Sequence, residues 1–178
     1  MNNKPISLRG MIYASLFGAI TAAGAYLIIP FPLVPITLQT LFLNLAAALL
    51  GGRLGALSQV IYILLGIIGL PVFAGGKAGI GVLIGPTGGY LIGFVVAAYV
   101  IGKLIEKKER AGFAWMAFSM VVGLVVIYLL GVTQLSIVAK LTIRKAVSVG
   151  VLPFLIGDAL KIIAATLISV KFREKIKL

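Results

Sequence analysis

The segment GVLPFLIGDALKIIAATLISV, residues 150–170, is long and apolar enough to cross a membrane, yet it contains Asp158 and Lys161 and no other charge. Residues three apart on a helix lie on one face, so the two charged groups point the same way. Within a membrane such groups are costly unless they are paired, buried or facing water, and they therefore indicate a ligand or ion site. The alternative is a structural ion pair, which apolar residues would replace at little cost.

The chain as a whole has the composition of a polytopic membrane protein. Of its 178 residues 61% are hydrophobic, and the mean hydropathy is +1.19. There are no cysteines or histidines, which excludes disulfides, Cys/His zinc sites and imidazole chemistry. The net charge of +12 does not indicate nucleic-acid binding, because the positions of the charges in a membrane protein matter more than their sum.

Six apolar segments predict an all-α membrane protein with six transmembrane helices in a single domain, residues 1–178. We place the spans at residues 10–30, 37–51, 54–70, 88–105, 112–132 and 152–170. The N-terminal apolar run is longer than the hydrophobic region of a signal peptide, so it is read as the first span. The proline-rich PFPLVP before the second span predicts extended backbone.

The distribution of basic residues predicts that both termini face the cytoplasm, because inner loops of membrane proteins carry an excess of lysine and arginine. This orientation places eleven basic residues inside and four outside. The inner set is Lys4, Arg9, Arg53, Lys103, Lys107, Lys108, Arg110, Lys171, Arg173, Lys175 and Lys177, and the outer set is Lys77, Lys140, Arg144 and Lys145.

The segment LPVFAGGKAGIGVLIGPTGGYL, residues 70–91, is too apolar for a solvated loop and too rich in glycine for a helix. It holds seven glycines from Gly75 to Gly89, two prolines and one charge, Lys77. Non-helical backbone at membrane depth is tolerated where it is buried in protein or lines a cavity. We therefore predict a re-entrant or capping loop between the third and fourth helices; the alternative is a mobile connection outside the membrane.

These features are predicted to meet near the outer face of the membrane. Pro153 suits the first turn of the last helix, which places Asp158 about 20 Å from the inner interface, in the outer third of the bilayer. The glycine-rich loop emerges on the same side. Lys77, Asp158, Lys161 and the loop amides would then form an outward-facing pocket for a small molecule with an anionic tail and an N–H-bearing head.

Two further segments indicate contacts outside the pocket. Ala14, Gly18 and Ala22 form a face of small residues on the first span, which suits either a partner helix or internal packing. Lys140 and Arg144 lie four apart in a segment that predicts an interfacial helix or an extension of the fifth span. Their charge suits anionic lipid, an anionic solute or a solvated basic face.

Motifs for catalysis or ATP hydrolysis are missing from the sequence. It has no GxxxxGK[ST] phosphate loop, no nucleophile–base pair and no cluster of metal ligands. It also lacks the chain of carboxylates or histidines that proton pumps use. The sequence therefore predicts a protein that is not an enzyme and that receives the energy for active transport from a partner.

Five short motifs occur in order along the chain: VPITLQT (34–40), GGRLGALSQ (51–59), GLPVFAGG (69–76), GPTGGYLIGF (85–94) and GDALK (157–161). Together they resemble the BioY family, the biotin-binding S components of energy-coupling factor (ECF) vitamin transporters. The resemblance implies the ECF S-component fold in a prokaryotic cell membrane and high-affinity capture of biotin at the outer face. It also implies membrane lipid around the helices, no cofactor, and delivery of biotin through a transmembrane coupling subunit that bears two ATP-binding subunits.

The resemblance also implies roles for particular residues. It places Asp158 and Lys161 in contact with biotin. It places Ala14, Gly18 and Ala22 in contact with the coupling subunit. Some family members carry arginine after GGY where this chain has Leu91, so Lys77 is the candidate partner of the biotin carboxylate. The candidate ligand-binding residues are Asp158, Lys161, Lys77, Tyr90, Phe73, Gly75, Gly76, Gln39, Asn44 and Gln59. For the last three, an interhelical hydrogen bond is the alternative.

Two other functions remain open at this point. One is an S component for a different vitamin, such as thiamin or riboflavin, which would call for stacking aromatic residues in the loops. The other is a solitary biotin facilitator or secondary transporter.

Overall fold

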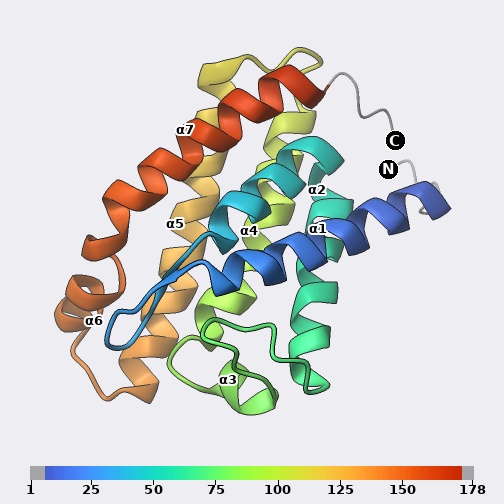
Figure 1. The fold of residues 1–178 in the computed structure, drawn as a ribbon. Coiled ribbons are helices and arrows are strands. Elements are labelled where there is room, and N and C mark those ends of the chain that lie inside the picture. The colour runs from blue at the N-terminus through green and yellow to red at the C-terminus, as the bar shows by residue number, and fades with distance from the viewer. Residues whose placement is uncertain (1–6, 174–178) are drawn as a thin grey trace.

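The computed structural model describes residues 7–173 and is mostly helical (Figure 1). Its helices are α1 (Leu8–Tyr26), α2 (Gln39–Ile67), α3 (Ile80–Ile84), α4 (Gly88–Glu106), α5 (Phe113–Val138), α6 (Ile143–Gly150) and α7 (Leu155–Phe172), with a 3₁₀ turn at Leu152–Phe154. Two short strands, β1 (Ile28–Ile29) and β2 (Ile36–Thr37), pair between α1 and α2. The predicted helical membrane fold is confirmed. Three basic residues of the orientation prediction, Lys4, Lys175 and Lys177, lie outside the described residues.

Helix α2 bends sharply at Gly51 and so supplies two of the six predicted spans. Gly51 has φ 82° and ψ 177°, a conformation that residues with a side chain rarely adopt. The Glu106 carboxylate, at the end of α4, accepts a 2.7 Å hydrogen bond from the Gly52 N–H and thereby caps the second half of α2. By length and composition, five helical segments of the described chain are able to cross a membrane, and the kinked α2 is counted as one of them.

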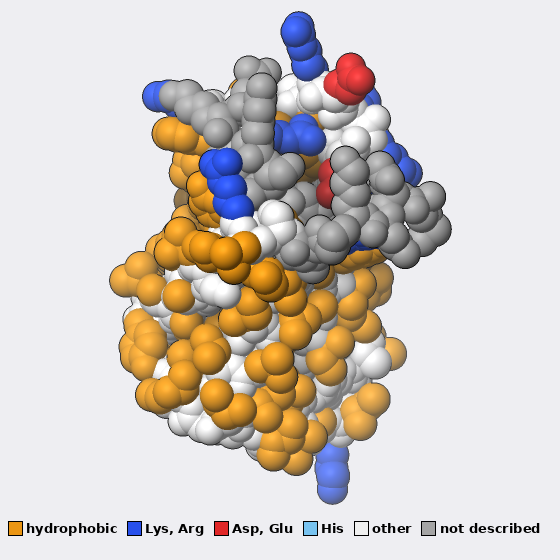
Figure 2. Space-filling model, turned by 90° about the vertical axis from the view of Figure 1, so that its right-hand side faces the viewer, with side chains coloured by type: hydrophobic (Ala, Val, Ile, Leu, Met, Phe, Trp, Pro, Cys, Tyr) orange, Lys and Arg blue, Asp and Glu red, His pale blue; other side chains and the backbone are white. Residues whose placement is uncertain are grey.

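The helices pack around α2 and α4. Helix α4 contacts both α2 and α5, α1 packs along α2, and α7 lies across α2 and α5 (Figure 1). Helix α1 begins and α7 ends at one end of the bundle, whereas the segment that contains α3 lies at the opposite end (Figure 1). Figure 2 shows a face covered mostly by hydrophobic side chains, with most of its charged side chains at one end. Such an apolar belt is the surface expected to contact lipid.

The chain between α1 and α2 forms a short hairpin. Helix α1 ends at Tyr26, before the predicted boundary at residue 30, and Ile28 pairs with Thr37. The PFPLVP segment forms the non-helical loop of this hairpin, because proline lacks an N–H and disfavours helical backbone at the residue before it. The hairpin leads the chain directly into the start of α2.

Two short helices refine the predictions for the connecting segments. Helix α5 runs on to Val138, which is the predicted extension of the fifth span. Helix α6 follows as a separate short helix, as the alternative prediction of an interfacial helix requires. Between them, Lys140 turns the chain with a φ of 51°. The glycine-rich segment requires a correction, because Ile80–Ile84 is helical where no helix was predicted.

The small residues of α1 divide between a buried face and an exposed face. Ala14, Gly18 and Ala22 are buried, and a Cβ on Gly18 would lie 2.9 Å from the Ser58 carbonyl oxygen of α2. Internal packing therefore accounts for the small size of these residues, while their contact with a coupling subunit stays a prediction. The neighbouring residues Ser15, Ala19 and Ala23 are the small residues that α1 exposes.

Candidate functional site

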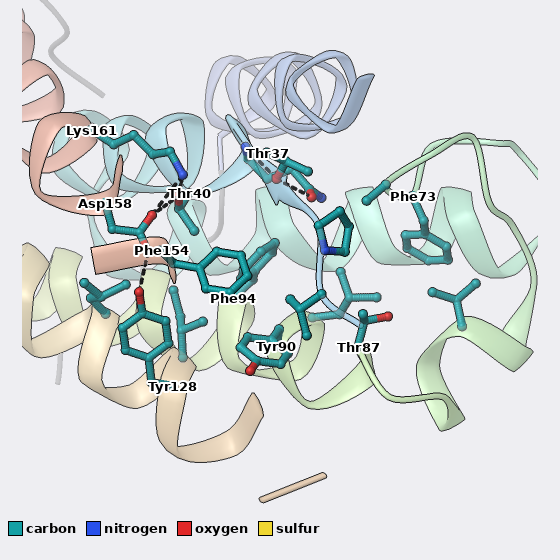
Figure 3. A pocket seen from close by; sticks show the side chains of 18 of the residues that line it. Thr37, Thr40, Phe73, Thr87, Tyr90, Phe94, Tyr128, Phe154, Asp158 and Lys161 are labelled. Atoms are coloured by element: carbon teal, nitrogen blue, oxygen red, sulfur yellow. Dashed lines mark hydrogen bonds and ion pairs between the residues drawn. The ribbon is translucent and has the colours of Figure 1, made fainter. Parts of the chain in front are cut away.

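A cavity lies at the end of the bundle that carries α3, with about 740 Å³ of empty space including the part open to solvent (Figure 3). Residues from the hairpin, α2, the 68–87 loop, α4, α5, the 3₁₀ turn and α7 contribute to its walls. They are Val34, Pro35, Thr37, Gln39, Thr40, Phe73, Ala74, Lys77, Val82, Thr87, Tyr90, Leu91, Phe94, Leu124, Ile127, Tyr128, Phe154, Asp158 and Lys161.

Four side chains at one end of the cavity form a hydrogen-bonded group that we call the Asp158 cluster: Thr40, Tyr128, Asp158 and Lys161. Lys161 Nζ lies 2.9 Å from Asp158 Oδ1, and the Tyr128 hydroxyl donates to Asp158 Oδ2 at 2.5 Å. The Thr40 hydroxyl donates to Oδ1 and accepts from Lys161 Nζ, both at 3.2 Å. Three helices thus hold one carboxylate in a fixed orientation, as Figure 3 shows.

Burial makes the charges of this cluster strongly dependent on each other. The side chains of Lys161 and Asp158 are only 9% and 6% exposed. Each charged group has lost most of its hydration. The charged form of each is therefore stabilised mainly by the opposite charge and by the neutral hydroxyls around it. The predicted convergence of these two residues on one face of the last helix is therefore confirmed, together with two polar partners that the sequence did not reveal.

Gln39 is held by a second polar contact beside the cluster. Its Oε1 accepts from the Thr37 hydroxyl at 2.8 Å, and its amide nitrogen donates to the Tyr62 hydroxyl at 2.5 Å. The Tyr62 ring in turn packs edge-on against Phe73, with 5.7 Å between ring centroids. The Gln39 amide is therefore oriented at the cavity wall by partners on both sides.

The glycine-rich loop closes the other end of the cavity. The Phe73 N–H donates to the Lys77 carbonyl at 3.0 Å, and Gly75 and Gly76 make the turn between them with φ of 74° and 71°. This turn carries Lys77 to the cavity mouth beside the buried Phe73 ring. The geometry confirms a loop that lines a cavity rather than a loop separated from it.

Two helices fasten this loop. The Gln134 amide of α5 donates to the carbonyls of Leu83 and Gly85, at 2.7 and 2.8 Å. On the other side, the Tyr26 hydroxyl of α1 donates to the Pro71 carbonyl. These bonds satisfy backbone groups that a loop at membrane depth would otherwise leave unpaired.

The cavity brings together six of the ten candidate residues: Asp158, Lys161, Lys77, Tyr90, Phe73 and Gln39. Gly75 and Gly76 shape the loop turn without lining the cavity. Asn44 is buried in α2, outside the lining. Gln59 also lies outside it and donates to Thr21 of α1 at 3.3 Å, which is the interhelical hydrogen bond considered as its alternative.

Sequence reasoning missed Tyr128, Thr40, Thr87 and Phe154 as lining residues. Thr40 ends the VPITLQT motif directly after the candidate residue Gln39, and this position in the motif could have identified it as a lining residue. Tyr128 is one of several hydroxyl-bearing residues in α5, and nothing in the local sequence marks it as a partner of a residue 30 positions away. Thr87 and Phe154 lie at helix starts, where proline or glycine neighbours indicate only a turn.

The arrangement suits non-covalent binding of an amphipathic molecule. The Asp158 cluster offers acceptors and donors at one side of the cavity, and the rings of Phe94, Tyr90 and Phe154 border its middle (Figure 3). Lys77 adds a cation to the lining, and its backbone pairs with that of Phe73, which lies apart from Asp158 in Figure 3. Among the described residues no group of three or more His, Cys, Asp or Glu side chains is placed to hold a metal ion.

Comparison with known proteins gives consistent matches over the full chain. The family model of the BioY family matches residues 1–178. The chain is 48% identical to "Biotin transporter BioY" of Thermotoga maritima, over 94% of this chain and 97% of that protein. It is 39% identical to "Probable biotin transporter BioY" of Lysinibacillus sphaericus, over 93% and 87% of the two chains. A crystal structure of the S-component for biotin from an ECF-type ABC transporter superposes with a TM-score of 0.85 and 26% identity, covering 94% of this chain and 92% of that chain.

Proposed function

Because this chain belongs to the BioY family, we propose that it is the biotin-capturing S component of an ATP-driven ECF importer. The proposal depends most on one observation: the Asp158 cluster faces a cavity that Lys77 also lines. The names of the relatives support a transport protein rather than an enzyme. In this proposal the termini are cytoplasmic and the cavity receives biotin from outside the cell.

The Asp158 cluster matches the ureido ring of biotin. That ring presents two N–H donors and one carbonyl acceptor. The Asp158 carboxylate already accepts from Lys161, Thr40 and Tyr128, which leaves one acceptor site for a ureido N–H. Lys161 has a third N–H to donate to the carbonyl besides its bonds to Asp158 and Thr40. Tyr128 holds the carboxylate in place, so little reorganisation is needed when biotin binds.

Lys77 is the proposed partner of the biotin carboxylate. Leu91 lines the cavity directly after GGY, where the family resemblance implies arginine in some members, and it offers no charge. The backbone of Lys77 pairs with that of Phe73, which lies apart from Asp158 in Figure 3, and an extended biotin molecule has its carboxylate at the end opposite its ureido ring. Thr87, in the same part of the cavity, supplies a neutral hydroxyl.

Replacing Lys77 with glutamine should weaken biotin binding about tenfold, which corresponds to about 1.4 kcal/mol. The expected loss is that of one hydrogen bond to a charged group, partly exposed at the cavity mouth. Titration calorimetry of the purified protein with biotin and with biotin amide, which lacks the negative charge, provides the measurement. The amide should bind wild-type and variant protein alike, and Lys145→Gln, outside the cavity, is the charge-matched control. An equal loss for both ligands would contradict the carboxylate assignment.

Coupling to a partner should depend on the exposed small residues of α1. Ala19→Leu should lower ATP-dependent biotin uptake by the reconstituted complex about tenfold, because it blocks close approach of a partner helix. Biotin binding by the isolated subunit should stay within about twofold of wild type, since Ala19 is exposed and is not among the residues that line the cavity.

Gly18→Leu is the informative comparison for Ala19→Leu. A side chain at Gly18 would collide with α2, so this variant should lose folded protein and biotin binding together. If Ala19→Leu leaves uptake unchanged, the coupling subunit docks on another surface. If Gly18→Leu folds and binds normally but fails in uptake, the originally predicted face of Ala14, Gly18 and Ala22 is the docking face.

A further inference from the structure

A second concavity lies on the outside of the bundle, between α5 and α6, which lie side by side (Figure 1). Its walls are mostly apolar and include Leu129, Thr133 and Ile137 of α5 and Ile143, Val147 and Val151 at α6. Leu129, Ile137 and Ile143 are 63%, 73% and 71% exposed, so this surface faces the lipid rather than the core. We call it the α5–α6 groove.

The polar groups of the α5–α6 groove are satisfied by the protein itself. The Thr133 hydroxyl donates to the Leu129 carbonyl at 2.7 Å, and the Ser136 hydroxyl donates to the Leu141 carbonyl at 2.7 Å. Neither hydroxyl needs a partner from outside. The groove therefore presents an apolar surface of the kind that a hydrocarbon chain fills.

Basic residues border the groove without acidic neighbours in the sequence. Arg144 lies three residues before Val147 on α6, so it lies beside this groove residue, at the border of the groove. Lys140 lies in the turn that joins the two helices. Both side chains are exposed, and residues 111–157 contain no aspartate or glutamate. The charge at the groove mouth is therefore positive.

We infer that the α5–α6 groove binds an anionic phospholipid, with one acyl chain along the groove and its phosphate at Lys140 and Arg144. Guanidinium and ammonium groups form charge-assisted hydrogen bonds with phosphate, and basic pockets beside membrane helices recognise anionic headgroups. Tyr128 lines both this groove and the ligand cavity, so the lipid chain would border the ring that holds Asp158. The inference needs no assumption about the ligand in the cavity.

Native mass spectrometry tests the inference on the full chain, taken from bilayers of equimolar phosphatidylglycerol and phosphatidylcholine. Wild-type protein should retain phosphatidylglycerol preferentially. The double variant Lys140→Gln/Arg144→Gln should retain about 25-fold less, because each basic residue near a membrane surface contributes about a fivefold preference for anionic lipid and two such residues are lost. Lys145→Gln is the matched control: its position two residues from both Ile143 and Val147 puts it on the opposite side of α6, and it should retain wild-type levels.

A third variant tests the acyl chain separately. Ile143→Trp places a bulky side chain at the groove from an exposed position, so the fold should persist while retention of both lipids falls severalfold. The inference is overturned if the double variant keeps wild-type retention, or if Lys145→Gln lowers retention equally, which would indicate only diffuse surface charge. It is also overturned if Ile143→Trp has no effect, because the groove would then hold no chain.

Discussion

Replacing Lys161 with alanine should destabilise the folded protein by about 3–5 kcal/mol, because it leaves the Asp158 charge buried without its counter-charge. Lys161 Nζ is 2.9 Å from Asp158 Oδ1, and both side chains are almost fully buried. Thermal unfolding in detergent measures the loss. Lys171→Ala, which removes an exposed lysine from the same helix, should unfold within a few tenths of a kcal/mol of wild type and controls for the change of charge.

A double variant separates loss of the pair from loss of packing. Asp158→Asn/Lys161→Met removes both charges and keeps side chains of similar volume, so it should recover most of the stability that Lys161→Ala loses. Neither variant should bind biotin normally. If Lys161→Ala is as stable as wild type, the buried Asp158 does not depend on the charge of Lys161, and this part of the account is wrong.

Replacing Asp158 with asparagine should weaken biotin binding at least about tenfold, or about 1.4 kcal/mol. The amide keeps the shape of the carboxylate but has one oxygen acceptor and two N–H donors, so an N–H donor would face either the ureido N–H or a donor that Asp158 now binds. It also removes the charge that strengthens each hydrogen bond. Ser169→Ala, a change at a buried polar residue of the same helix outside the cavity lining, should leave binding unchanged.

The positions of the long helices were readable from the sequence because hydropathy separates the apolar segments from their connections, whereas the orientation of the termini stays a prediction. The six predicted spans correspond to α1, the two halves of α2, α4, α5 and α7. Their ends were less predictable. The β1–β2 hairpin rests on four paired residues, too few for a periodic pattern, and α3 is a single helical turn within glycine-rich sequence. Both depend on contacts with the surrounding helices rather than on local preference.

The site was readable where a residue conflicts with its surroundings. Asp158 and Lys161 stand out because a charge is rare in an apolar span, and Lys77 because it is the one charge of the glycine-rich loop. Tyr128 causes no such conflict, and only the packing of α5 against α7 brings its hydroxyl to Asp158. The small residues of α1 also show what sequence reasoning does not identify. Spacing identifies a close contact but does not identify the helix that makes it, which here is α2.

Isothermal titration of biotin into purified wild-type and Asp158→Asn protein tests the central claim most directly. The account predicts that one biotin binds each wild-type chain. Asp158→Asn leaves the Lys161 charge buried without its counter-charge and so loses stability as well, and the fraction that circular dichroism shows to be folded should bind biotin at least about tenfold more weakly. Absence of biotin binding by folded wild-type protein would contradict the proposed function. Equal affinity of the two proteins would contradict the assignment of the Asp158 cluster as the ureido site.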